Sequence, residues 1–464
     1  MPSRADGWSI LASTEGTRTK VVIYTTDVLA AKMAGPGIRA LRFAEAISAV
    51  AEVRLVSELR ADLQRDGFEI LRAGGDDLLR QIEWADVVVL QGALLTMLPE
   101  VVSMDTLIVA DMYDPFLLEQ LQQDYFLGGQ SDDDVLAFTV RLVNDMVRYP
   151  DFLICASEKQ RDFWIGQLSS QGRLNARTYR ADPSLRSLID VVPFGVDEQP
   201  AELASHGIRG VVDGIGMTDK VLIWGGGIYD WFDPLTLIRA VGVLTERHDD
   251  LRLFFLATAH ANPAVPAMQM SDDAIALAKS LGLLGSSVFF NDQWVPHERR
   301  ADYLLDADVG VSTHLDHLET AFSFRTRLLD YLWAGLPIIN TAGDAFEPII
   351  LEHELGAVVP PGDVDALADA IEQLVYGPET LAAAAARVRE VAPDFVWTRA
   401  LAPLVEYCRA PYAAADDPRA GGVVEDGSTA DLRRQLAELR ASKSWRVTAP
   451  LRALLRAFSR LRRR

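Results

Sequence analysis

The sequence predicts an α/β protein with two Rossmann-like domains, each a mostly parallel sheet between layers of helices. Three observations predict this class. Short apolar runs rich in β-branched residues alternate with longer amphipathic segments, as in parallel sheets covered on both faces. This alternation occurs in two series, separated by a weakly patterned stretch at 200–218. With 464 residues, the chain is also too long for one hydrophobic core.

Each series supplies six candidate strands. Those of the first domain are expected at 20–26, 52–57, 86–91, 106–112, 151–156 and 188–194. Those of the second domain are expected at 220–225, 251–257, 287–291, 308–312, 336–341 and 356–360. Ligands of such sheets bind beyond the carboxyl ends of the strands, so binding residues are expected in the loops that follow them.

The composition excludes several classes of protein. Apolar residues make up 49% and charged residues 24% of the chain, which is typical of a globular protein. The two cysteines, Cys155 and Cys408, lie far apart in apolar segments, so we expect no disulfide framework and a reducing, cytoplasmic compartment. No run approaches the ~18 apolar residues of a membrane span. A leader at 1–19 lacks the apolar stretch of a signal peptide.

The formal charge of −21 is unevenly distributed. Residues 431–464 contain eleven basic and two acidic side chains, a charge of +9, which leaves −30 on the rest of the chain. Because residues 1–430 are this acidic, they would repel the phosphate backbone of a nucleic acid, and we expect no nucleic-acid partner.

A glycine-rich loop follows the first strand of each domain. In MAGPGIRALRFAEAI (33–47), Gly35 and Gly37 allow the backbone to approach a ligand at a helix N-terminus, although a tight turn explains them equally well. Their spacing does not match the dinucleotide fingerprint.

The second of these loops, WGGGIYDWFDP (224–234), contains Gly225, Gly226 and Gly227 in succession. Three consecutive glycines carry a large entropic cost, which favours a ligand role over a purely structural turn.

A third loop region, HLETAFSFRTRLLDYLWAG (317–335), places charged residues in a segment that is otherwise apolar. A helix is expected to end at Gly335. On that helix Asp330 shares a face with Ser323 and Arg327, while Arg325 lies roughly 140° away and could join only from a frayed first turn. This arrangement suits an anionic ligand, but an internal Arg327–Asp330 ion pair explains it equally well.

Several segments together resemble family 4 glycosyltransferases. The second half contains LDYLWAGLPIIN, GDAFEPII and GAVVPPGDVDALADAIEQL, and MAGPGIRA, VADMYDP, ICASEKQRDFW, VVPFGVD and WGGGIYDWFDP are in register with that family over roughly 20–410. The resemblance implies a GT-B arrangement, with two Rossmann-like domains facing across a cleft. It also implies sugar transfer from a nucleotide donor with retention of configuration.

The resemblance assigns domain boundaries and roles. We expect a first, acceptor domain at 20–205, a second, donor domain at 206–395, and a helix at 396–410 that returns to the first domain.

The donor-site motif of the family, Glu-x7-Glu, is only partly present. Asp330 occupies its second position and is expected to hold ribose hydroxyls, but the first position falls on Phe322. Glu319 is the nearest acid able to contact the donor sugar. The family's Arg and Lys after the glycine loop are also absent, so Arg325 and Arg327 are expected to contact the pyrophosphate instead.

The resulting candidate site falls into three groups. The catalytic candidates are Glu319, Arg325 and Arg327. The donor-binding candidates are Gly225, Gly226, Gly227, Trp294, Val295, Ser323, Asp330 and His260. Trp294 could stack on the base, but a place in the core explains it equally well. The acceptor-side candidates are Gly35, Gly37, Arg39, Tyr113 and Asp114. No metal or other cofactor is expected, because His314 and His317 have no supporting ligand cluster.

The C-terminal segment predicts membrane contact. We expect a linker at 411–430 and a basic tail at 431–464. In the last part of the tail, Pro450–Arg464, the leucines and Phe458 share one helical face and arginines occupy the rest, as in a helix that lies on a membrane surface. Docking of this helix on the acidic body is the alternative. The SKSWRVTAPLR string resembles tails of bacterial surface-polysaccharide glycosyltransferases, which implies a peripheral enzyme at the inner face of the cell membrane.

The sequence therefore predicts a retaining, metal-independent glycosyltransferase with a glycan or lipid-linked acceptor. Two other functions stay open. A nucleotide-sugar epimerase can share the fold, and a non-catalytic scaffold could have lost the motif residues.

Overall fold

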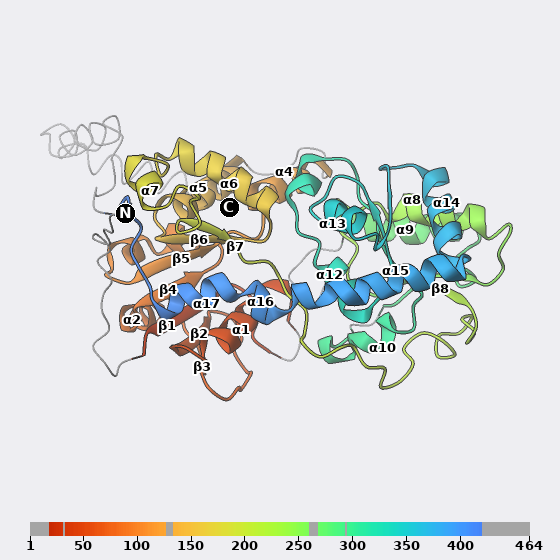
Figure 1. The fold of residues 1–464 in the computed structure, drawn as a ribbon, viewed down its shortest axis with the longest axis horizontal. Coiled ribbons are helices and arrows are strands. Elements are labelled where there is room, and N and C mark those ends of the chain that lie inside the picture. The colour runs from red at the N-terminus through yellow and green to blue at the C-terminus, as the bar shows by residue number, and fades with distance from the viewer. Residues whose placement is uncertain (1–17, 31–32, 127–132, 259–267, 293–294, 420–464) are drawn as a thin grey trace, which may run out of the picture. The chain divides into compact units, whose positions relative to one another are not determined.

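The computed structural model describes residues 18–419, apart from 31–32, 127–132, 259–267 and 293–294 (Figure 1). The chain divides into a compact unit of residues 1–416 and a second unit of residues 417–464. The basic tail, including Pro450–Arg464, and nearly all of the leader lie outside the described residues.

The first sheet is parallel and has seven strands in the order β3-β2-β1-β4-β5-β6-β7. Its strands are β1 (Lys20–Thr25), β2 (Glu52–Ser57), β3 (Glu69–Arg72), β4 (Val87–Leu90), β5 (Leu107–Asp111), β6 (Phe152–Cys155) and β7 (Ile189–Val191). Its helices are α1 (Gly35–Ile47), α2 (Asp76–Trp84), α3 (Leu94–Met97), η1 (Pro99–Ser103), α4 (Phe116–Phe126), α5 (Asp133–Arg148), α6 (Glu158–Ser170) and α7 (Ala176–Ala181).

The second sheet is parallel and has six strands in the order β10-β9-β8-β11-β12-β13. Its strands are β8 (Lys220–Trp224), β9 (Leu251–Phe255), β10 (Val288–Phe290), β11 (Val309–Ser312), β12 (Ile338–Thr341) and β13 (Gly356–Val359). Its helices are α8 (Pro234–Leu244), α9 (Gln269–Ser280), η2 (His297–Arg299), α10 (Arg300–Leu304), α11 (Leu318–Phe322), α12 (Thr326–Ala334), α13 (Glu347–Glu352), α14 (Val364–Val375) and α15 (Pro378–Val391).

The predicted fold class is confirmed, and each expected strand is present within three residues of its expected bounds. The sequence did not predict β3. This edge strand has no buried residue, so it lacks the apolar run that marked the others.

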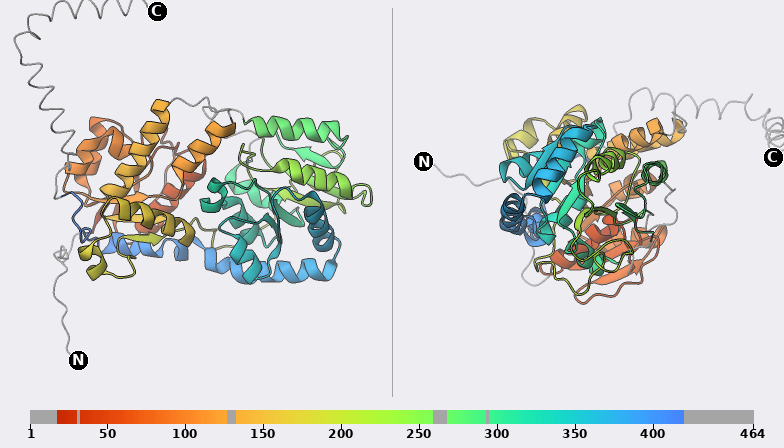
Figure 2. Two further views of the ribbon diagram at one scale, coloured as in Figure 1. Left: turned by 90° about the horizontal axis from the view of Figure 1, so that it is seen from above. Right: turned by 90° about the vertical axis from the view of Figure 1, so that its right-hand side faces the viewer.

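The chain crosses itself where it passes between the two sheets. The Val196 N–H donates to the Phe395 carbonyl (2.8 Å) and the Trp397 N–H donates to the Val196 carbonyl (3.0 Å). A Cβ on Gly195 would lie 2.7 Å from the Trp397 Cα, so only glycine permits this crossing. Figure 2 shows α15, η3 (Ala392–Phe395), α16 (Trp397–Ala400) and α17 (Ala402–Arg409) as the blue helices that lead back to the first sheet. There α17 packs against α1.

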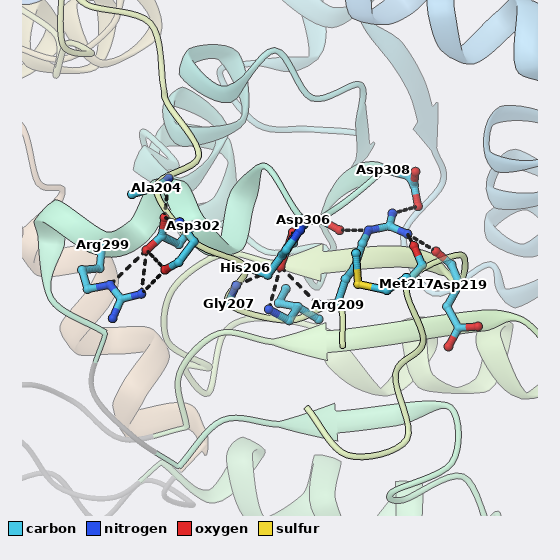
Figure 3. A network of polar contacts seen from close by, with 12 residues as sticks. Ala204, His206, Gly207, Arg209, Met217, Asp219, Arg299, Asp302, Asp306 and Asp308 are labelled. Carbon is cyan, nitrogen blue, oxygen red and sulfur yellow. Dashed lines mark hydrogen bonds and ion pairs between the residues drawn. The ribbon is translucent and has the colours of Figure 1, made fainter. Parts of the chain in front are cut away.

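Two buried aspartates anchor the connecting segment at 200–218 to the second domain (Figure 3). Asp306 accepts hydrogen bonds from three successive backbone N–H groups at 207–209 (2.9, 2.8 and 3.1 Å). Asp302 accepts from the backbone at 204–205 (3.0 and 3.1 Å). The segment looked weakly patterned because its order comes from these polar anchors and not from apolar periodicity.

The first part of the expected linker is bound to the first domain. Asp416 forms an ion pair with Arg173 (2.5 Å), and both side chains are almost fully buried. Ala414 is buried too, and its N–H donates to Asp151 (3.1 Å). The part of the expected linker up to Asp416 is therefore held by the first domain. No helix in the described part of the chain is long and apolar enough to cross a membrane.

Candidate functional site

The glycine loop after β8 is pinned to α12 by a tyrosine that the sequence did not single out. The Gly225 N–H donates to the Tyr331 hydroxyl (2.8 Å), and a Cβ on Gly225 would lie 3.1 Å from the Tyr331 ring. The same ring packs on Gly310 in β11, where a Cβ would lie 2.4 Å away. A glycine inside a strand signals such a close approach, so Gly310 could have pointed to it.

Glu319 and Arg325 form a buried, bidentate ion pair. Glu319 lies in the short helix α11 instead of on a loop, and its carboxylate accepts from the Arg325 guanidinium at 2.7 and 3.0 Å. The Ser323 hydroxyl donates to the same carboxylate. Glu319 is 1% and Arg325 is 6% exposed. The two charges neutralise each other, so Arg325 brings no net positive charge for a phosphate.

Arg327 is a buried cation for which the described residues supply no carboxylate partner. Its guanidinium donates to the Gly227 carbonyl (2.9 Å) and lies over the rings of Trp224 (4.3 Å) and Phe232 (4.1 Å). Its pKa is lowered to about 10, mainly by burial, with Tyr331 opposing the shift and the nearby Arg325 adding to it. Its Nη1 has no hydrogen-bond partner among the described residues.

The expected alternative of an Arg327–Asp330 ion pair is wrong. Asp330 pairs with Arg300 of α10 (3.0 Å), and Arg300 also reaches Asp197 in the connection between the sheets (2.8 Å). The Arg300 guanidinium stacks on Trp333 (4.1 Å). With 37% of its side chain exposed, Asp330 keeps surface for a ligand.

Carboxylates of the first domain lie close to the Glu319–Arg325 pair. The loop after β5 is held near α11 by Gln160, whose amide donates to the carbonyls of Tyr113 (2.6 Å) and Phe322 (2.8 Å). Burial raises the pKa of Asp114 to about 7, and repulsion from Asp111 and Glu319 contributes.

Glu119 on α4 is a further acid in this region, and the sequence did not single it out. Burial raises its pKa, and the charges of Asp114 and Glu319 raise it further. Both first-domain carboxyls are therefore held toward their neutral forms.

The remaining acceptor-side candidates are occupied by internal contacts. The Asp27 carboxylate accepts from the Gly37 N–H (3.1 Å), so an internal anion already sits at the N-terminus of α1, where Gly35 is the first residue. Arg39 is fully buried and bonds bidentately to Asp111 (2.7 and 2.8 Å). A direct acceptor contact from Arg39 stays a prediction that its burial does not favour.

Other expected donor-side residues are placed only in part. His260 and Trp294 lie outside the described residues, and Val295 is half-buried against the core. His317 caps α11 by accepting from the Thr320 N–H (3.2 Å). Across the described residues, no group of three or more histidine, cysteine, aspartate or glutamate side chains could hold a metal ion.

A groove of about 530 Å³ lies elsewhere, at the amino ends of the second sheet's strands. Its lining includes Lys220, Asp308, Pro337 and Arg389. Because ligands of parallel sheets bind at the carboxyl ends, we do not assign the site to this groove.

Residues 219–376 match the family model described as Glycosyl transferases group 1. The chain therefore has a GT-B fold, and its second domain is similar to the Glycosyl transferases group 1 family over the matched residues. D-inositol 3-phosphate glycosyltransferase of Saccharomonospora viridis is 26% identical over 243 residues, which cover 51% of this chain and 53% of that protein. The chain thus spans about half the length of the curated relatives it matches.

Solved structures share the fold at low identity. Anabaena HepE in complex with UDP-glucose superposes with a TM-score of 0.62 at 13% identity, covering 84% of this chain and 98% of that chain. WaaG, a glycosyltransferase involved in lipopolysaccharide biosynthesis, superposes with a TM-score of 0.56 at 16% identity, covering 84% and 99%.

Proposed function

We propose that this protein is a retaining, metal-independent glycosyltransferase that moves a sugar from a nucleotide-sugar donor to a cell-surface glycan acceptor. The observation that carries the proposal is Arg327, a buried cation beside the glycine loop with no carboxylate partner among the described residues. Burying a charge without a counter-ion is costly, so such a group indicates an anionic ligand.

A diphosphate fits the position of this cation. Arg327 lies in the first turn of α12, whose N-terminus has no side-chain cap, and the partial positive charge there favours anions. It also contacts Gly227, at the end of the strand where the order of the sheet reverses. As the bond from sugar to phosphate breaks, negative charge grows on the leaving diphosphate, and Arg327 would stabilise it. Asp330 would accept hydrogen bonds from the ribose hydroxyls.

The first-domain side favours an uncharged acceptor. The described groups that lie near Glu319 from that side include Asp114 and Glu119, whose raised pKa values hold them toward their neutral forms. Such carboxyls can exchange hydrogen bonds with hydroxyl groups but offer no positive charge to a phosphorylated acceptor. The name of the curated relatives specifies D-inositol 3-phosphate, whereas WaaG acts in lipopolysaccharide biosynthesis. We therefore propose a neutral polyhydroxy acceptor, attached to a lipid.

The proposal includes peripheral membrane contact on the cytoplasmic side through Pro450–Arg464, based on the amphipathic pattern alone. Co-sedimentation with anionic vesicles, and none with neutral vesicles, is the expected result. Equal binding to both kinds of vesicle would contradict it.

A thermal-shift experiment tests the donor site. Wild type, Arg327→Met and the exposed control Arg80→Met are each mixed with UDP, GDP and dTDP at about 100 times the dissociation constant, where a bound ligand stabilises by about 2.7 kcal/mol. Methionine keeps the apolar stem against Trp224 and removes the charge. We expect one diphosphate to stabilise wild type and the control but not Arg327→Met, whose unliganded stability should be equal or higher.

The other outcomes separate the alternatives. Stabilisation by no diphosphate would support the scaffold function. Stabilisation followed by conversion of the nucleotide sugar without an acceptor would support an epimerase.

A further inference from the structure

Six buried polar atoms without a hydrogen-bond partner among the described residues gather at the carboxyl ends of β11 and β12. They belong to four side chains, each 0–2% exposed: Ser312 Oγ, both ring nitrogens of His314, Oδ1 and Nδ2 of Asn340, and Oδ2 of Asp344. Buried polar groups in proteins nearly always have partners, so a cluster of this size calls for an occupant.

The four residues are neighbours in space. Ser312 and Asn340 are paired across the β11–β12 ladder. The backbone N–H of His314 donates to the Thr341 hydroxyl (3.3 Å), and the ring Nε2 of His314 lies 3.7 Å from the Asp344 carboxylate. Asn340 lies close enough to lower the pKa of Asp344, although burial raises that pKa overall and no well-formed hydrogen bond joins them.

The cluster adjoins the candidate donor site. His314 forms a backbone bridge with Phe232, the ring on which Arg327 stacks. Arg325 affects the pKa of both His314 and Asp344, and its Nε also has no hydrogen-bond partner among the described residues. The cluster therefore lies one strand beyond the glycine loop, on the same edge of the sheet.

The chemistry of the cluster selects the occupant. Burial lowers the pKa of His314 to about 3, so its ring is neutral and offers one donor and one acceptor. Asn340 offers both kinds of group as well, whereas Asp344 accepts and Arg325 donates. Glu319 neutralises Arg325, and burial raises the pKa of Asp344 toward its neutral form, so the cluster has little net charge and hydroxyl groups of a neutral ligand fit best.

We propose that Ser312, His314, Asn340 and Asp344 form the subsite that binds the hydroxyl groups of the donor's sugar and selects which sugar is transferred. This inference rests on the proposed function, because it takes the diphosphate to lie at Arg327. The diphosphate would be held over β8 and α12, and the sugar over β11 and β12.

The test separates the sugar from the diphosphate. Dissociation constants for UDP, GDP and dTDP, and for UDP-glucose, GDP-mannose and dTDP-glucose, are measured by calorimetry on the full chain. The variants are Asn340→Leu, which removes two of the atoms at similar volume, and Ser312→Ala, which removes one hydroxyl. The matched control is Ser57→Ala, because Ser57 also ends a strand and is fully buried, but its hydroxyl donates to the Asp27 carbonyl (2.7 Å).

We expect both subsite variants to bind the sugar nucleotide at least tenfold more weakly and the free diphosphate within twofold of wild type. Ser312→Ala should leave the unfolding temperature unchanged or raise it, whereas Ser57→Ala should lower it and leave both affinities unchanged. Unchanged affinity for the sugar nucleotide would overturn the inference and assign the cluster to internal water. Wild type that binds no diphosphate would overturn the proposed function itself.

Discussion

The Glu319–Arg325 pair gives the sharpest prediction about stability. Three variants test it: Glu319→Ala, Arg325→Met and the two combined. Both side chains are at most 6% exposed, and the pair is bidentate at 2.7 and 3.0 Å. Removing Glu319 alone leaves a buried, unpaired guanidinium beside Arg327, another cation.

The expected magnitudes follow from this burial. Loss of one partner of a buried ion pair costs about 3–5 kcal/mol, whereas replacing both by apolar groups is often close to neutral. Glu319→Ala should therefore destabilise by about 4 kcal/mol, and the double variant should recover at least about 2 kcal/mol of that loss.

Urea unfolding followed by circular dichroism measures these differences in the free energy of unfolding. The urea concentrations at the midpoint are compared between variants whose dependence of free energy on urea has the same slope. A cost of less than about 1 kcal/mol for Glu319→Ala would refute the reasoning, as would single effects that simply add in the double variant. Either result would mean that the pair is not closed in solution, and that Glu319 and Arg325 are available to the donor after all.

Three other predictions concern single sites. Gly310→Ala places a methyl group 2.4 Å from the Tyr331 ring and should cost about 2–3 kcal/mol in thermal unfolding, whereas Gly166→Ala in α6, with no atom within 4 Å, should be neutral or stabilising. Because the pKa of Asp114 is raised to about 7 in the folded protein, its contribution to stability is lost as the pH rises from about 4 to 7. Asp114→Asn should therefore raise the free energy of unfolding by up to about 4 kcal/mol at pH 8 and not at pH 4, and equal effects at both pH values would contradict this. Asp416→Ala breaks a buried ion pair and should cost about 3 kcal/mol and expose Tyr412 in residues 411–416 to chymotrypsin; unchanged digestion would contradict this.

The sequence by itself determined where the buried strands of the two sheets lie and where helix α12 ends. Continuous apolar runs such as VVIYT in β1 and VLIW in β8 fix buried parallel strands, because period and composition are local properties of the chain. The end of α12 is also set by a local feature of the sequence, because Gly335 adopts the left-handed conformation (φ 70°) that glycine permits. Both features could therefore be predicted within a residue or two.

The partners of the charged residues were decided only by the tertiary structure. From helical spacing, Arg327 and Asp330 could pair, and Arg325 and Arg327 looked equivalent. In the folded chain Asp330 pairs with Arg300, thirty positions away, and Glu319 neutralises Arg325. One arginine of the three is left without a counter-ion among the described residues, and the sequence could not say which. Spacing along a helix restricts which side chains can meet, but burial and distance between elements decide which charges are compensated, and the uncompensated one marks the candidate site.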